Sequence, residues 1–140
     1  MSSQPIKISW QGNKQFLASS STGHTILMDG PPHAGGLDAG TRPMEMVLMG
    51  LAGCASFDVV TILEKKKAQL TSLELEVHAI RRVQIPAVFE KIELTYKVEA
   101  TGVSQIAVEK AVMLSLDKYC SVAAMLRAGG VDISAQVELV

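Results

Sequence analysis

The sequence has few aromatic residues, no excess of either charge and only two cysteines. Aromatic residues make up 4% of the 140 residues and hydrophobic residues 48%, so aliphatic and Met side chains must build most of the core. The 13 basic and 14 acidic residues nearly cancel, and no basic patch alternates with aromatics. Nucleic acid and anionic membranes are therefore poor candidate partners.

Segments typical of export or membrane insertion are also lacking. The first residues, MSSQPIKISWQG, do not show a basic stretch followed by an apolar one. No stretch is expected to span a membrane, since the most apolar one is short and carries Glu45 and Asp58. We therefore expect a cytoplasmic protein. In that reducing compartment, two cysteines separated by 65 residues indicate either inert buried thiols or redox chemistry rather than a disulfide framework.

Motifs for metals, phosphates and hydrolysis are missing as well. His24, His33 and His78 have no metal-ligand spacing to one another or to the cysteines. The glycines near residue 35 do not form a phosphate loop, and the sequence has no GxSxG or HExxH motif. We expect neither a metal site nor a cofactor.

One long helix is expected over residues 41–67. Arg42 is kept from helical dihedral angles by the proline that follows, whereas Pro43 fits the first helical turn. Glu45 near the start and the lysines at 65–67 near the end suit the two poles of the helix dipole. Because the first half is apolar on every side, this helix must be enclosed.

The rest of the chain alternates between strand and helix patterns. The expected elements are three short antiparallel strands within 6–28, a mobile glycine-rich loop over 30–40, strands over 73–79 and 92–98, a helix over 108–117, a short helix over 122–126 and a strand over 131–139. This order predicts an α+β fold, and the length suits a single domain covering residues 1–140.

The two cysteines are the candidate catalytic residues. A thiol is a nucleophile only as the thiolate, and a helix N-terminus or a nearby cation lowers its pKa. Cys120 is placed at or just before the start of the short helix, and Lys118 lies two residues away. Cys54 lies mid-helix, one turn before Asp58, whose charge would raise the thiol pKa. From these residues alone, inert buried thiols remain an alternative.

Two carboxylates in the long helix are further candidates. Asp58 interrupts the apolar segment CASFDVV, so it marks either a place where the helix reaches solvent or a pocket residue with a perturbed pKa. Glu45 is best interpreted as a first-turn charge, because nine residues at about 100° each place it opposite Cys54 on an ideal helix. The two could still share a chamber if the helix bends or a second subunit intervenes.

The segments RPMEMVLMGLAGC, ASFDVV and KYCSVAAML resemble the OsmC/Ohr superfamily, most closely its YhfA-like branch. The resemblance covers nearly the whole chain. It implies an OsmC-like fold of antiparallel strands around a long central helix, in an intertwined homodimer with paired sites at the interface. It also implies reduction of organic hydroperoxides by an antioxidant stress protein. Cys54 would become a sulfenic acid, Cys120 would resolve it as a disulfide, and a dithiol would reduce the pair.

The sequence departs from the peroxidase pattern at two supporting positions. Those members use an arginine from the N-terminal strands and a glutamate early in the long helix to hold the thiolate. Here no arginine precedes Arg42, and Glu45 stands one place after the usual position of the glutamate. Arg42, Lys14 or an arginine of a second subunit could substitute. Two functions therefore stay open: a thiol-dependent peroxidase, or a dimeric protein that binds a small apolar ligand.

Overall fold

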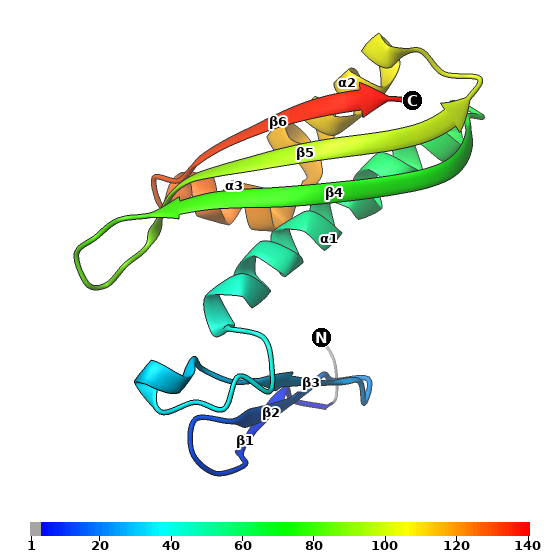
Figure 1. Ribbon diagram of the computed structural model, residues 1–140. Helices are drawn as coiled ribbons and strands as arrows, with labels where there is room; N and C mark the ends of the chain where they lie inside the picture. The colour runs from blue at the N-terminus through cyan, green and yellow to red at the C-terminus, as the bar shows by residue number, and fades with distance from the viewer. Residues whose placement is uncertain (1–3) are drawn as a thin grey trace. The chain divides into compact units, whose positions relative to one another are not determined.

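The computed structural model describes residues 4–140 (Figure 1), and contacts divide the chain into two compact units, residues 1–47 and 48–140. Helices and strands are both present, so the expected α+β class is confirmed. The single-domain organisation stays a prediction.

The first unit contains a small antiparallel sheet in the order β1-β2-β3. Its strands are β1 (Lys7–Trp10), β2 (Phe16–Ser19) and β3 (Thr25–Met28), which confirms the expected meander. Gly12 and Asn13, in the turn between β1 and β2, both have positive φ angles, of 101° and 48°. Glycine and asparagine tolerate this conformation better than other residues, so the turn accounts for the presence of Gly12 and Asn13 at these positions.

The glycine-rich loop after β3 is ordered around Asp29, and it includes a short 3-10 turn, η1 (Pro32–Ala34). The Asp29 carboxylate is 2% exposed and accepts hydrogen bonds from the backbone N–H groups of Gly30, Leu37 and Ala39. A Cβ atom at Gly36 would lie 2.0 Å from the Gly30 carbonyl oxygen. The expected mobile loop is therefore tied by hydrogen bonds and by a close backbone approach.

Helix α1 (Pro43–Lys65) begins at the predicted proline. Its buried residues recur every fourth position and form one stripe: Leu51, Ala55, Val59 and Leu63. Other apolar side chains stay exposed, with Phe57 at 74% and Met49 at 53%. Within this chain, α1 is therefore covered on one side only, and its enclosure on every side stays a prediction.

Helix α1 is also long and apolar enough to cross a membrane, with a mean hydropathy of 2.0 over its most apolar window. The expectation that no stretch reaches this length is wrong, because residues 46–63 contain one charged residue, Asp58, which does not lower their mean hydropathy enough. Core helices of soluble proteins have the same composition, so this property alone is weak evidence for a membrane span.

The second unit is a three-stranded sheet with helices on one face (Figure 1), in the order β4-β5-β6. Strands β4 (Gln69–Arg81) and β5 (Phe89–Thr101) pair antiparallel, as expected. Strand β6 (Asp132–Leu139) pairs parallel to β5, so antiparallel pairing fails there. The helices between β5 and β6 carry the chain back to the start of the sheet, which makes parallel pairing available.

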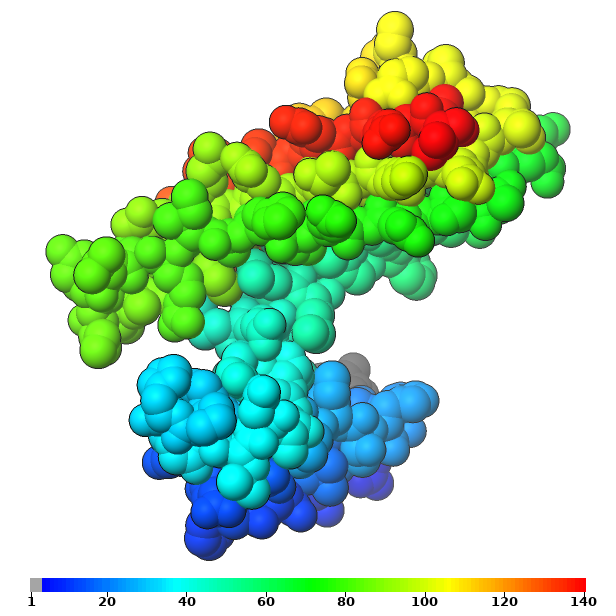
Figure 2. Space-filling view, viewed as in Figure 1, coloured from blue at the N-terminus to red at the C-terminus, as the bar shows by residue number. Residues whose placement is uncertain are grey.

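Helix α2 (Gln105–Leu114), a π-helical turn labelled η2 (Ser115–Tyr119) and helix α3 (Ser121–Ala128) form that connection. They and the second unit's part of α1 cover the apolar side of β5, where alternate residues are buried. Within residues 48–140, no helix covers the opposite face of the sheet, so side chains of β4, β5 and β6 form the surface seen in Figure 2. The fully buried core side chains of this unit include Leu51, Val59, Leu63, Ile92, Leu94, Tyr96, Val98 and Val108.

Candidate functional site

The second unit brings the two cysteines together, although they are far apart in sequence. Cys54 is half-buried on α1, and Cys120 is 2% exposed at the junction between the π-helical turn and α3. Cys120 is the N-cap residue of α3, so its predicted place at the start of a short helix is confirmed. Both thiols are free. They interact closely enough for Cys54 to alter the pKa of Cys120.

The pKa of the Cys120 thiol is raised, mainly because the side chain is buried. Hydrogen bonding with Cys54 and the charge of an ionised Cys54 raise this pKa further. The backbone N–H groups of Ala123 and Val122 lower the pKa but do not compensate, and the Ala123 nitrogen lies 3.4 Å from the sulfur.

The N–H groups at the helix N-terminus thus lower the pKa of Cys120 as expected, but burial outweighs them and the pKa is raised overall. Lys118 is the cation that was expected to lower the pKa of Cys120, and its ammonium nitrogen lies 5.5 Å from the centre of the Tyr119 ring. Cys120 is consequently a protonated thiol near neutral pH.

Tyr96 brings a hydroxyl group to the buried side of this site. It is fully buried on β5, and its Oη atom lies 3.3 Å from the Ser56 hydroxyl on α1. Burial raises the pKa of Tyr96, the Ser56 hydrogen bond lowers it, and the charges of Cys120 and Asp58 raise it. The Tyr96 phenol is therefore neutral, and it lies close enough to Cys120 and Asp58 for their charges to affect its pKa. The sequence does not indicate this role of Tyr96, because the alternation of β5 predicts only a core residue.

Asp58 is half-buried on α1 and close to a buried hydroxyl. Its Oδ2 atom lies 3.5 Å from the Oγ atom of Ser115, whose hydroxyl also donates to the Ala55 carbonyl at 2.9 Å. On its outer side, Asp58 lines a groove of about 430 Å³. The other lining residues are Thr61, Ile62, Lys65, Lys66, Leu114 and Tyr119. Asp58 therefore lies at the border between the thiol site and this groove.

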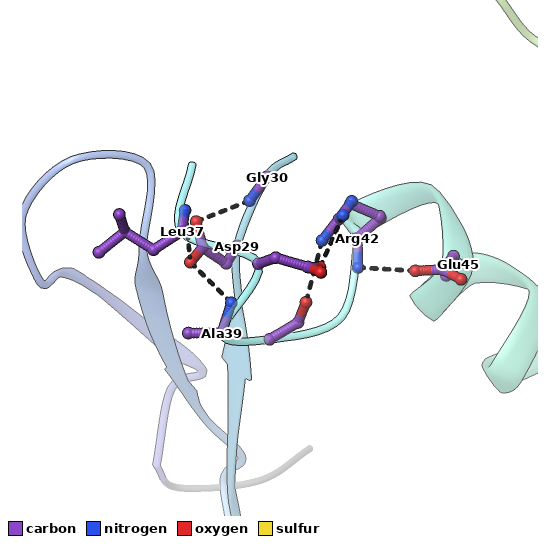
Figure 3. Close-up of polar contacts among 8 residues, drawn as sticks. Asp29, Gly30, Leu37, Ala39, Arg42 and Glu45 are labelled. Carbon is purple, nitrogen blue, oxygen red and sulfur yellow. Dashed lines mark hydrogen bonds and ion pairs between the residues drawn. The ribbon is translucent and has the colours of Figure 1, made fainter. Parts of the chain in front are cut away.

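Arg42 and Glu45 belong to the first unit, where they bond to each other (Figure 3). The Arg42 backbone N–H donates to the Glu45 carboxylate at 3.0 Å, which is half of a capping box at the start of α1. The Arg42 guanidinium pairs with Asp38 at 2.8 Å and donates to the Gly40 carbonyl at 3.2 Å. Both side chains thus have local structural roles, and their predicted support of Cys54 stays a prediction.

No group of three or more His, Cys, Asp or Glu side chains is placed to hold a metal ion anywhere in residues 4–140. The second unit instead contains a pair of interacting thiols, Cys54 and Cys120, with hydroxyl groups nearby. A half-buried thiol beside a buried, protonated one is an arrangement suited to thiol and disulfide chemistry.

These features define a dithiol-containing α+β protein whose long helix carries one thiol and whose last helical connection carries the other. The chain belongs to the OsmC-like protein family, whose model matches residues 35–136. Protein YhfA of Escherichia coli strain K12 is 40% identical over 134 residues, which cover 96% of each chain. Both the superfamily and the YhfA-like branch expected from the sequence are therefore confirmed.

Solved structures share the fold. A hypothetical protein from Aquifex aeolicus is 30% identical with a TM-score of 0.81, and the match covers 100% of this chain and 99% of that one. An organic hydroperoxide resistance protein from Legionella pneumophila is 17% identical with a TM-score of 0.69, and the match covers 99% of both chains. The second likeness establishes the fold alone.

Proposed function

We propose that the protein is a thiol-dependent hydroperoxide reductase in which Cys54 is the peroxidatic and Cys120 the resolving cysteine. The observation that carries this proposal is the interaction of the two thiols within one compact unit, from segments separated by 65 residues. Membership of the OsmC-like family supports it, since the family includes proteins named for organic hydroperoxide resistance.

The proposed reaction has three balanced steps. The Cys54 thiolate attacks the outer oxygen of the hydroperoxide, the O–O bond breaks, and the alkoxide takes a proton to leave as an alcohol while Cys54 becomes a sulfenic acid. The Cys120 sulfur then attacks the Cys54 sulfur, and hydroxide takes the Cys120 proton and leaves as water. A dithiol finally reduces the Cys54–Cys120 disulfide and is itself oxidised to a disulfide.

The surroundings of Cys120 suit a resolving thiol. Its raised pKa keeps it protonated while the peroxide reacts, so its S–H group can donate toward an ionised Cys54 sulfur. A protonated thiol is a poor nucleophile, so Cys120 does not compete for the peroxide. Asp58 is proposed as a supporting residue, because it is near Ser115 and borders the groove outside.

The test follows loss of cumene hydroperoxide in the presence of dithiothreitol. The wild-type protein is expected to turn over, and Cys54→Ser to fall to the uncatalysed rate, because serine cannot form a sulfenic acid. Cys120→Ser is expected to consume about one equivalent of peroxide in the absence of dithiol, since oxidation stops at the sulfenic acid. Equal slow rates in wild type and Cys54→Ser would overturn the proposal.

We also propose that the protein works as a homodimer in the cytoplasm. The exposed apolar side chains of α1, such as Phe57 and Met49, form a face that a second copy of the chain would cover. Reducing conditions would keep both thiols available. Light scattering is expected to give twice the chain mass of 15.0 kDa, and a well-folded monomer would contradict the dimer.

A further inference from the structure

Ser115 connects the two segments that carry the cysteines. It is fully buried at the first position of the π-helical turn. Its hydroxyl donates to the carbonyl oxygen of Ala55, the residue after Cys54, at 2.9 Å. Its own carbonyl oxygen accepts the backbone N–H of Cys120 at 2.7 Å. One residue therefore bonds directly to both sides of the thiol pair.

The local backbone explains why this position matters. In a regular α-helix, the N–H of Cys120 would bond four residues back, whereas here it reaches five residues back to Ser115. The π-helical turn thus inserts one residue and delivers Cys120 with extended dihedral angles at the start of α3. Such single π-turns are frequent at functional sites.

Serine suits this position because its side chain is small and carries a donor. A carbonyl oxygen has two lone pairs, so the Ala55 carbonyl can accept the Ser115 hydroxyl besides a helical N–H. The Asp58 carboxylate, 3.5 Å from the same hydroxyl, adds a second acceptor nearby. An alanine here would leave the π-helical turn without its hydrogen bond to α1.

We propose that Ser115 is a positioning residue that holds the Cys120 segment against α1 and thereby sets how readily Cys54 and Cys120 form a disulfide. That this positioning by Ser115 contributes to peroxide reduction rests on the proposed function. The role itself concerns only the two thiols, because disulfide formation requires narrow ranges of Cα separation and dihedral angle.

The expected effect is a change in the effective concentration of one thiol at the other. A net hydrogen bond to a neutral group is worth a factor of about three to ten in an equilibrium constant. Ser115→Ala should therefore make the disulfide about three- to tenfold less favourable.

The experiment equilibrates the reduced protein with mixtures of oxidised and reduced dithiothreitol. Two protein thiols are oxidised as one dithiothreitol disulfide is reduced, and the oxidised fraction is measured by alkylation and mass spectrometry. Ser104→Ala is the matched control, because it removes the N-cap hydrogen bond of α2 from the N–H of Ala107. That control should lower stability without moving the disulfide equilibrium.

Two results would overturn the role of Ser115: an unchanged equilibrium in Ser115→Ala, or an equal shift in Ser104→Ala. If Ser115→Ala shifts the disulfide equilibrium but the wild-type protein does not turn over peroxide, the proposed function alone would be overturned. Normal turnover with no response to Ser115→Ala would overturn this inference alone.

A measurement on the wild-type chain covers the case in which Ser115→Ala does not fold. The Cys120 amide should exchange its hydrogen as slowly as the amides of α2, because it donates to Ser115 at 2.7 Å. Exchange at the rate of an unprotected loop amide would overturn the proposed connection.

Discussion

Two buried ionisable groups, Asp29 in the first unit and Cys120 in the second, meet backbone N–H donors but shift in opposite directions. Burial raises the pKa of Asp29, but the N–H groups of Ala39, Gly30 and Leu37 lower it below its ordinary value, with help from Gln15. Burial also raises the pKa of Cys120, and there the N–H groups do not compensate.

The difference lies in the acceptor. The Asp29 carboxylate has two oxygen atoms with several lone pairs, and its three N–H partners lie at 2.7, 3.1 and 3.2 Å. The Cys120 sulfur is a weak acceptor, and the Ala123 nitrogen is 3.4 Å away. The first unit therefore uses a charge as a structural anchor, whereas the second keeps its thiol neutral inside an apolar core.

The largest expected effect concerns the apolar core of the second unit. Ile92 on β5 is fully buried, so Ile92→Ala should lower the free energy of unfolding by about 2–5 kcal/mol. Ile80 on β4 is 59% exposed, so Ile80→Ala in the same sheet should cost about 0.5 kcal/mol or less. Denaturant unfolding measures both. Similar costs would show that burial in this sheet does not decide stability.

The next effect tests the anchor of the first unit. Asp29→Asn removes the charge and turns one acceptor into a donor that faces backbone N–H groups. The loop should loosen, and the fluorescence of Trp10, the single tryptophan, should report it because Trp10 lies in the same unit. The Cys54–Cys120 disulfide equilibrium should stay as in wild type. An unchanged Trp10 signal would show that the charge is not the anchor.

Acid should have a similar effect on the wild-type first unit. Because the native pKa of Asp29 is lowered from 3.8, its contribution to stability is fully present above that pH. The contribution is lost as the pH falls through the native pKa. Trp10 fluorescence should therefore change below pH 3.8 in wild type, and this step should be absent in Asp29→Asn. A step at higher pH would assign the titration to another group.

Much of the fold could be predicted because its signals are local. Pro43 marked the start of α1, and the apolar residues before Gly129 marked α3 and hence the place of Cys120. The direction of β6 could not be predicted, since alternation shows which face is buried and not which way the partner strand runs. How much of α1 this chain itself covers could not be predicted for a similar reason, because an apolar sequence does not say what covers it.

The candidate site was predictable only in part. Cysteine is rare and chemically distinctive, so Cys54 and Cys120 stand out in any sequence. Ser115 and Tyr96 do not, because their importance comes from contacts to residues 60 and 40 positions away along the chain. The anchor at Asp29 was missed as well, since a carboxylate before a glycine-rich loop is common and its N–H partners are set by the folded loop.

The smallest expected effect is the pH dependence of a single thiol, and it tests the second half of the comparison directly. In Cys54→Ser, Cys120 is the remaining thiol, and its alkylation rate should rise with pH with a midpoint above the ordinary value of 9.0. Burial is the main cause of the raised pKa and survives the substitution, whereas the contribution of Cys54 is lost. In denaturant, the midpoint should return to the ordinary value.

Access to the reagent changes the alkylation rate at every pH but not the midpoint, so the comparison of folded and denatured protein isolates ionisation. A midpoint below 9.0 in the folded protein would mean that the N–H groups of α3 outweigh burial, as they do around Asp29, and the contrast between the two units would disappear.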